Sequence, residues 1–379
     1  MEKYKIKDIC TILNGRAYKY EELQDSGKYR ILRVGNFFSK DDWYYSDMEL
    51  DDNKYCYDGD LLYAWSANFG PKIWEGEKTI YHYHIWKVIP NENVDKMFLY
   101  YKLYSITDRL KDSSHGSVML HLTKSDMENF EIELPKLDQQ KKIGKILKNI
   151  DDKIKLNTEI NNNLYELAIK YLNEMQSDEE VTLSKFGKIQ GGYAFKSKDL
   201  LNTKTNNRII KIKNLRNEIS ADVINSQFVE NEVIDKLDNK FKIKKGNVAI
   251  AMTGAELGKT GFIYGFDDYY LNQRVGLVRG ITKEKELYLN ILLLSQEFQD
   301  LLNSKGYGSA QPNVSTADIE NITIQNIEDD DLMKFYEKVS PIYKKIILNC
   351  EENLNLEQLR NTLLPKLMNG EIDLYNIEI

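Results

Sequence analysis

The sequence predicts an α+β protein built as an internal pseudo-two-fold repeat. Two homologous mixed α/β domains are separated by two long helices that pair as an antiparallel coiled coil. Three observations predict this fold. One heptad stripe occurs twice, 192 residues apart, and the segments before each stripe also match. Short strand-like runs also precede each helix, and they do not alternate regularly with helices. The predicted domains are 1–135 and 177–328, and the predicted helical spacers are 136–176 and 329–379.

The heptad stripe is the strongest sign of the duplication. Steps of four and three from Ile143 give apolar residues, then Asn157 and Asn161, then mostly apolar residues again. The same steps further along the chain place Asn349 and Asn353 in the same heptad slots. If these asparagines are buried between the helices, they cost stability but penalise slipped registers. The alternative interpretation is that the asparagines face solvent. We expect pairing and register to depend on the central positions: Ile150, Ile154, Asn157, Asn161, Leu164, Ile342, Ile346, Asn349, Asn353 and Leu356.

Local signals place the remaining elements. Ser340 and Pro341 have the form of a cap and a first helical turn, so we expect the second long helix to break near 340. Pro365 predicts that this helix ends at about Leu364. Amphipathic spacing predicts further helices at 97–110 and 286–303. Strand-like composition predicts strands at 30–34, 60–65, 85–89 and 130–134.

Composition excludes several classes of protein. The chain has 379 residues, of which 42% are hydrophobic and 29% charged, and it lacks an apolar run long enough to span a membrane. Its three cysteines lie far apart, which excludes a disulfide framework or a zinc ribbon and favours a reducing cytoplasm. The formal charge of -7 argues against a uniformly basic surface, although not against a local basic face.

The motifs that could indicate catalysis are incomplete. The run 254–260 resembles a phosphate-binding loop but has three residues between its glycines where that loop needs four. His82 and His84 have the spacing of two metal ligands on one face of a strand, but no third ligand is evident. We therefore expect no catalytic residue, no metal site and no cofactor in this chain.

A local basic cluster points to nucleic acid. Five basic residues and no acidic residue lie between Lys204 and Arg216, and glycine-bounded loops elsewhere offer hydroxyl, amide and imidazole groups that can read base edges. Two diverged domains on a rigid spacer suit a bipartite, asymmetric site in double-stranded DNA, because identical domains would read identical half-sites. The candidate DNA-binding residues are Arg16, Lys19, Arg30, Arg33, Ser66, Asn68, Lys72, His115, Ser117, His121, Lys196, Arg208, Lys211, Lys213, Thr253, Lys259, Thr260, Arg274, Tyr307, Ser309, Gln311 and Asn313.

Three segments resemble a known family. The run HLTKSDMENFEIELPKLDQQKKIGKILKNIDDKIKLN at 121–157 strongly resembles the central region of specificity subunits of Type I restriction-modification systems. The run LRNTLLPKLMNGEI at 359–372 resembles their C-terminal end. GNVAIAMTGAELGKTG at 246–261 looks like a recurring strand and loop of their target recognition domains, which also accounts for the incomplete phosphate-binding loop. The resemblance covers essentially the whole chain.

The resemblance implies a function and partners. Such a subunit carries two target recognition domains, each of which reads one half of a split DNA sequence. Its helices set the spacing and dock two modification subunits, which form an adenine methyltransferase that uses S-adenosylmethionine. Restriction subunits, which use ATP and magnesium, complete an ATP-dependent endonuclease. All these cofactors belong to the partners, so the chain itself is expected to be a non-catalytic, cytoplasmic DNA-recognition subunit without a membrane partner.

Other functions stay open at this point. The chain could serve a methyltransferase-nuclease of another restriction class, where domains and spacer are similar. It could also be a coiled-coil adaptor that binds only protein, against which the basic cluster and the duplication of complete domains both argue. A standalone enzyme is disfavoured because the sequence offers no nucleophile, metal site or cofactor loop.

Overall fold

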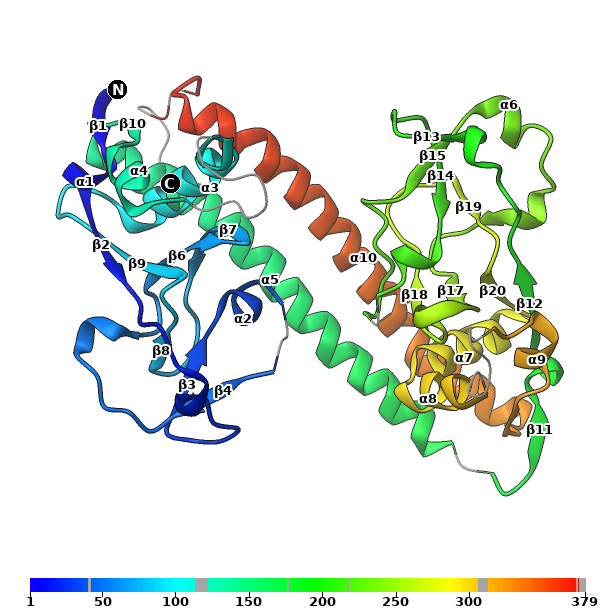
Figure 1. The fold of residues 1–379 in the computed structure, drawn as a ribbon. Coiled ribbons are helices and arrows are strands. Elements are labelled where there is room, and N and C mark those ends of the chain that lie inside the picture. The colour runs from blue at the N-terminus through cyan, green and yellow to red at the C-terminus, as the bar shows by residue number, and fades with distance from the viewer. Residues whose placement is uncertain are drawn as a thin grey trace. The chain divides into compact units, whose positions relative to one another are not determined.

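The computed structural model describes residues 1–39, 42–112, 122–175, 177–216, 218–305, 313–372 and 374. Its contacts divide the chain into two compact units. The first unit consists of Met1–Asp152 together with the chain from Leu356 onward, and the second is Lys153–Asn355. Each unit contains one mixed α/β domain and a segment of both long helices (Figure 1).

The domain of the first unit is built on short strands. These strands are β1 Glu2–Lys5, β2 Cys10–Asn14, β3 Tyr29–Leu32, β4 Tyr44–Ser46, β5 Tyr55–Cys56, β6 Leu61–Ser66, β7 Asn68–Ile73, β8 Thr79–Tyr81, β9 Ile85–Pro90 and β10 Glu131–Leu134. The helices of this domain are α1 Ile6–Ile9, α2 Val34–Phe38, α3 Lys96–Asp112 and α4 Lys124–Asn129. The strands form two four-stranded sheets, β2-β9-β6-β7 and β4-β3-β8-β5, and a β1-β10 pair.

The domain of the second unit repeats this plan. Its strands are β11 Glu180–Thr182, β12 Gly187–Gly191, β13 Leu200–Leu201, β14 Asn207–Ile210, β15 Gln227–Val229, β16 Lys242–Ile243, β17 Val248–Ala251, β18 Thr260–Phe262, β19 Tyr269–Leu271, β20 Val275–Gly280 and β21 Thr323–Gln325. Its helices are α6 Asn231–Ile234, α7 Lys283–Leu294, α8 Gln296–Lys305 and α9 Thr316–Glu320. The sheets have the orders β12-β20-β17-β18, β13-β15-β14-β19-β16 and β11-β21.

The two domains match strand for strand. In both, a four-stranded antiparallel sheet lies beside a sheet with one parallel pair, which is β3-β8 in the first domain and β14-β19 in the second. The second domain adds only the edge strand β13 to this arrangement of the described residues. The predicted duplication and the mixed α/β class are therefore confirmed, and the four predicted strands appear as β3, β6, β9 and β10.

The two long helices are α5 Leu137–Glu174 and α10 Asp329–Met368. In the second unit, Asn157 donates to Asn353 over 2.9 Å, and Asn349 donates to Asn161 over 2.8 Å. As the residue number rises by four along α5, its partner's number falls by four along α10, so the helices run antiparallel. In the first unit, Arg360 donates to Asp151 over 2.7 Å in the same sense. The predicted antiparallel coiled coil is confirmed.

The expected helix boundaries at proline are wrong. The helix α10 passes through Pro341 without a break and continues beyond Pro365 to Met368. A proline inside a helix costs about 3 kcal/mol because it removes a hydrogen bond and clashes with the preceding turn. Burial of Val339 and Tyr343 around Pro341, and of Leu367 near Pro365, holds these turns in the hydrophobic cores and offsets that cost.

A second correction concerns the helix predicted at 286–303. The structure has two helices there, α7 and α8, separated by Ser295. The Ser295 hydroxyl donates to the carbonyl of Leu292 over 2.6 Å and lies 3.3 Å from the amide nitrogen of Phe298. Ser295 thus ends one helix and caps the next, as serine does at helix starts.

Each unit has a core in which a domain packs on both long helices. In the second unit, Leu172 of α5 and Phe335 of α10 join α7, α8 and the β12-β20-β17-β18 sheet in one cluster. In the first unit, Leu147 of α5 and Leu364 of α10 join α3 in the same way. The helices are therefore part of each domain's core, and each domain is held firmly on the helix pair.

Candidate nucleic-acid interface

The candidate interface of each domain is built on one tight turn between two strands. The turn joins β8 to β9 in the first domain and β19 to β20 in the second. In each domain a glycine packs against the carbonyl oxygen of the first residue of the turn. A Cβ on Gly15 would overlap His82, and a Cβ on Gly192 would overlap Asn272. Because only glycine permits this approach, both turns are fixed by backbone packing.

A second loop supports each turn through matching hydrogen bonds. In the first domain, the Trp65 amide donates to the His84 carbonyl over 3.1 Å. In the second, the Met252 amide donates to the Arg274 carbonyl over 3.0 Å. His84 and Arg274 therefore occupy equivalent places, as do the loops that follow β6 and β17.

Backbone strain marks the same loops. Among the described residues, Ala67 and Arg274 are the two non-glycine residues with positive φ, at 61° and 68°. Gly254, in the loop after β17, has a φ of 76° and allows the same turn without strain. A non-glycine residue in this region costs about 1–3 kcal/mol, and such strain gathers at functional sites.

The turn of the first domain carries aromatic and imidazole rings. The rings of His82 and Tyr83 lie 4.4 Å apart, those of Tyr83 and His84 lie 3.9 Å apart, and Tyr18 stacks on His82. Burial, with further contributions from His84 and Arg33, lowers the pKa of His82 to about 4. His82 is therefore neutral at pH 7, with one ring nitrogen as donor and the other as acceptor.

The same place in the second domain carries amide and cationic groups. Asn272, Gln273 and Arg274 form the turn, and the last two are exposed. The Arg274 guanidinium donates from Nη1 to Asn313 over 3.1 Å. Tyr193, Phe195 and Phe241 form the aromatic cluster beside this turn, with ring centroids 5.0 Å and 5.5 Å from Tyr193. One scaffold thus presents different hydrogen-bonding groups in the two domains.

Several candidate DNA-binding residues already have protein partners. Arg16 forms two hydrogen bonds to Glu22, at 2.6 and 3.1 Å, and Lys259 pairs with Glu256. Arg208 lies between Phe228 and Phe266, with its guanidinium carbon 4.7 and 3.8 Å from their ring centroids. Burial lowers the pKa of Arg208, which marks it as partly withdrawn from water.

The other first-domain candidates differ in what they contact. Arg30 pairs with Glu77 at 3.3 Å, and Arg33 donates to the Asp42 carbonyl over 2.9 Å. Lys72 donates to the Phe37 carbonyl over 2.9 Å. Ser66 is buried, whereas Asn68 and Lys19 are exposed. His115, Ser117 and His121 lie outside the described residues.

In the second domain, the exposed candidates are Lys196, Lys213, Arg274 and Asn313. Lys211 bonds to Gln227, and Thr253 forms an isolated bridge with Asn313. Thr260 is fully buried and accepts from Gln299 over 3.1 Å, so it does not face solvent. Tyr307, Ser309 and Gln311 lie outside the described residues.

Sequence reasoning left out His82, Tyr83, His84, Asn272 and Gln273 from the candidate interface, and considered two of them only as metal ligands. Aligning YHYHI at 81–85 with LNQRV at 271–275 through the duplication would have identified this turn. Among the described residues no cluster of three or more His, Cys, Asp or Glu side chains is placed to hold a metal ion.

The asparagines of the helix pair are buried. Asn157, Asn161 and Asn349 have exposed fractions of 1%, 5% and 0%, which excludes the solvent-facing alternative for them. Among the other stripe positions, Ile150 and Ile346 are buried, and the half-buried ones are Ile154, Leu164, Ile342, Asn353 and Leu356. Asn157 also donates to Glu352 over 2.9 Å, so both amide hydrogens have acceptors within the pair.

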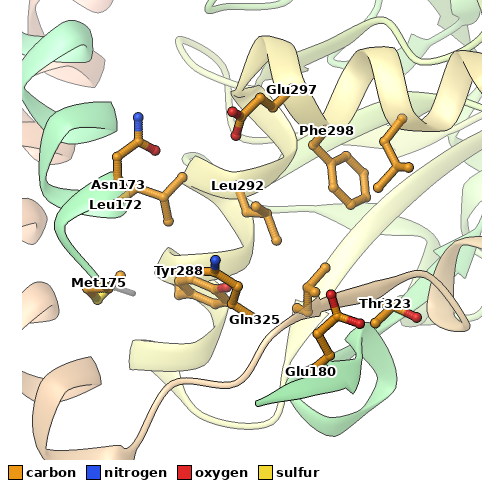
Figure 2. Close-up of a pocket in the computed structure, with 12 residues that line it drawn as sticks. Leu172, Asn173, Met175, Glu180, Tyr288, Leu292, Glu297, Phe298, Thr323 and Gln325 are labelled. Atoms are coloured by element: carbon orange, nitrogen blue, oxygen red, sulfur yellow. The ribbon is translucent and has the colours of Figure 1, made fainter. Parts of the chain in front are cut away.

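A pocket of about 480 Å³ lies in the second unit, away from the turn (Figure 2). Figure 2 shows Leu292 and Phe298 in this pocket, with Glu180 and Glu297 at its edge. Its described lining contains two carboxylates and no basic side chain, which disfavours a nucleic-acid phosphate. The pocket is therefore not part of the candidate interface.

None of the described helices is long and apolar enough to cross a membrane.

The chain is similar to proteins of one family. Residues 1–166 and 178–358 match the family described as the Type I restriction modification DNA specificity domain. The chain is 26% identical over 349 residues to the Type I restriction enzyme MjaVIII specificity subunit of Methanocaldococcus jannaschii, covering 84% of this chain and 80% of that protein. It is 25% identical over 312 residues to the MjaIX specificity subunit of the same organism, covering 75% of this chain and 71% of that protein.

The fold is shared with a solved structure. The S subunit of a Type I restriction-modification system from M. genitalium matches with a TM-score of 0.62 at 16% identity, over 97% of this chain and 95% of that one. Both domains and both helices of the present chain fall within this match. The chain therefore belongs to the Type I restriction modification DNA specificity family and carries two copies of its domain.

Proposed function

We propose that each domain of this DNA specificity subunit reads one half of a bipartite, asymmetric DNA site. Residues 1–135 and 177–328 are the two target recognition domains, with spacers at 136–176 and 329–379. The observation that carries this proposal is the shared turn with different side chains, His82 to His84 in one domain and Asn272 to Arg274 in the other. The same backbone presenting different donors and acceptors reads different bases.

The buried asparagine pairs support a spacer of fixed length. A shift of one heptad between α5 and α10 would remove the hydrogen bonds of Asn157 with Asn353 and of Asn349 with Asn161. Each buried amide would then lose a partner, which costs about 1–3 kcal/mol for each group. These bonds favour one register of the helices within the second unit, and in this proposal the helix register sets the spacing of the two half-sites.

Exposed leucines support docking of the same partner twice. Leu156 on α5 and Leu348 on α10 are 192 residues apart and have exposed fractions of 50% and 49%. Leu167 and Leu359 form a second such pair. Leucines exposed at equivalent positions of both repeats suit two copies of one protein. The partners in this proposal are two modification subunits, joined by restriction subunits.

The chemistry in this proposal belongs to the partners. A specificity subunit is itself non-catalytic, and its family needs no cofactor. The modification subunits use S-adenosylmethionine for adenine methylation, and the restriction subunits use ATP and magnesium for cleavage. The complex works in the cytoplasm, where its DNA substrate lies.

The test is adenine-methylation mapping of DNA from cells that express the chain with its neighbouring methyltransferase, against cells that lack the chain. We expect a split, asymmetric methylated motif that appears only with the chain. In a second arm, residues 1–135 are replaced by the corresponding domain of another specificity subunit. One half of the motif should change while the other half and the spacing stay the same. Absence of chain-dependent methylation beside an active partner would favour the adaptor function.

A further inference from the structure

Arg274 is held in place more firmly than an ordinary exposed arginine. Its backbone has positive φ, and its carbonyl accepts from the Met252 amide over 3.0 Å. The preceding residue, Gln273, donates its amide to the Tyr193 carbonyl over 2.7 Å. Asn313 accepts from Nη1 of Arg274 over 3.1 Å and is itself bridged to Thr253. The backbone and one edge of the guanidinium are thus both fixed.

The charge of Arg274 has no acidic partner within the part of the chain that the structure describes. Other arginines of this domain differ in this respect. Arg208 lies between two phenylalanine rings, and Arg216 pairs with Asp222 at 2.5 Å. The amide oxygen of Asn313 orients the Arg274 guanidinium without neutralising its charge. The other N–H groups of Nη1 and Nη2 form a planar fork that points away from this hydrogen bond.

We propose that Arg274 selects a guanine in the half-site read by the second domain, with Asn313 as the residue that positions it. One remaining N–H of Nη1 and one of Nη2 match the O6 and N7 acceptors that guanine presents in the major groove, which is the commonest specific contact of arginine with DNA. The proposal rests on the function proposed above and identifies one base and one residue within it. A lysine cannot replace this contact fully, because it lacks the planar fork.

The first domain predicts a contrast. His84 occupies the place of Arg274 there, and the whole turn of that domain lacks a guanidinium. The guanine contact is therefore specific to the second domain. Changes at Arg274 should alter only the half-site that remains when residues 1–135 are exchanged.

The experiment maps adenine methylation by the full complex carrying Arg274→Gln, Arg274→Lys or the control Lys188→Ala. Lys188 is also exposed, cationic and in the second domain, and it is not among the candidate DNA-binding residues. In Arg274→Gln, we expect the complex no longer to require guanine at one position of the second half-site, with discrimination against other bases falling roughly tenfold or more. The first half-site and the spacing should stay unchanged, and Lys188→Ala should keep the whole motif.

The proposal would be overturned by an unchanged motif in Arg274→Gln, by a change in the first half-site, or by an equal decrease at all sites with the motif intact. An equal decrease at all sites is what a phosphate contact would give. Loss of all methylation in both Arg274 variants with thermal unfolding unchanged would also contradict base selection.

Asn313→Ala covers the case in which the Arg274 variants do not fold. This variant keeps the arginine but frees Nη1, so it should relax the same base to a smaller degree, and a motif unchanged there would count against the proposal. If the unmodified chain directs no methylation, the function proposed above fails instead.

Discussion

The two recognition domains share a backbone but differ in how their side chains use it. Gly59 and Gly246, with φ of 81° and 82°, make the same turn before β6 and β17. In the first domain, the carbonyl of Gly59 accepts from Lys96 of α3 over 2.7 Å. In the second, the carbonyl of Gly246 accepts from Tyr343 of α10 over 2.7 Å and from Asn290 of α7 over 3.3 Å.

This difference shows what the duplication has kept. Glycines that permit close approach or positive φ recur at equivalent places, because the turns they build cannot form otherwise. The groups that satisfy the turns or face outward have diverged, as His84 and Arg274 have. Divergence in those outward groups is the basis on which we propose different specificities for the two domains.

The largest effect is expected from adding a Cβ beneath the turn that joins β19 to β20. In Gly192→Ala, the new methyl would overlap the Asn272 carbonyl, so the turn of the second domain must move. We expect loss of recognition of the second half-site and a stability loss of several kcal/mol, since overpacking typically costs about 1–3 kcal/mol and backbone cannot yield as a side chain does. Methylation mapping and thermal unfolding measure the two effects.

The neighbouring glycine provides a matched control. A Cβ on Gly191 meets only Thr316 at 3.5 Å, an ordinary contact, so Gly191→Ala should keep the motif. Gly15→Ala should reproduce the Gly192→Ala effect in the first domain, where the clash is with His82. Equal behaviour of the Gly191 and Gly192 variants would show that the turn is not fixed by this packing.

An intermediate effect is expected in the helix pair. The duplication relates Asn157 to Asn349 and Asn161 to Asn353. The two asparagines of α10 differ in burial, because Asn349 is fully buried and Asn353 is half-buried. Asn349→Ala removes the donor to Asn161 in a dry environment, and we expect a loss of about 1–3 kcal/mol. Asn353→Ala should cost less, because Asn157 keeps Glu352 as an acceptor. Urea unfolding distinguishes them, and equal losses would contradict unequal burial.

The smallest effect is a pH dependence of stability confined to the first domain. The pKa of His82 falls from 6.5 in the unfolded chain to about 4 in the fold, mainly through burial. Between these values the unfolded state binds a proton that the folded state does not, so stability falls as the pH drops from 6.5 toward 4. Because the ring is partly exposed, the full shift overstates the loss.

The measurement compares the free energy of unfolding of the natural chain and of His82→Asn between pH 4.5 and 7.5. Asparagine is the residue at the equivalent position of the second domain, Asn272, and does not titrate. The two curves should run parallel above pH 7 and diverge below 6.5, with the natural chain losing more stability. Curves that stay parallel throughout would assign no such role to His82.

The duplication, the antiparallel helices and the mixed domains could be predicted from the sequence because periodicity and repeats are properties of many residues together. The boundaries could not, since local signals at Pro341 and Ser295 compete with tertiary packing that the sequence does not display. Burial of Val339 and Tyr343 prevails over Pro341, whereas the capping hydroxyl of Ser295 prevails over the periodicity of 286–303.

The candidate interface was less predictable for a similar reason. Whether Arg16 or Arg274 is available to DNA depends on which partners the fold brings near. Glu22 pairs with Arg16 and neutralises its charge, whereas Asn313 orients Arg274 and leaves its charge in place. The shared turn with His82 and Asn272 was hidden because its side chains have no residue type in common. Its sign in the sequence is a pair of glycines, Gly15 and Gly192, that lie far from the turn along the chain.

The division of the chain into a continuous and a discontinuous unit has a consequence for synthesis. Lys153–Asn355 is a single stretch, but Met1–Asp152 needs the segment from Leu356 onward to complete its core, where Leu364 and Leu367 pack near Leu147. At about 5–20 residues per second, a ribosome takes on the order of 10–40 s to make the intervening residues. The domain synthesised first is thus the one that must wait, with apolar helix surface open to chaperones, while the domain synthesised second can fold as soon as it emerges.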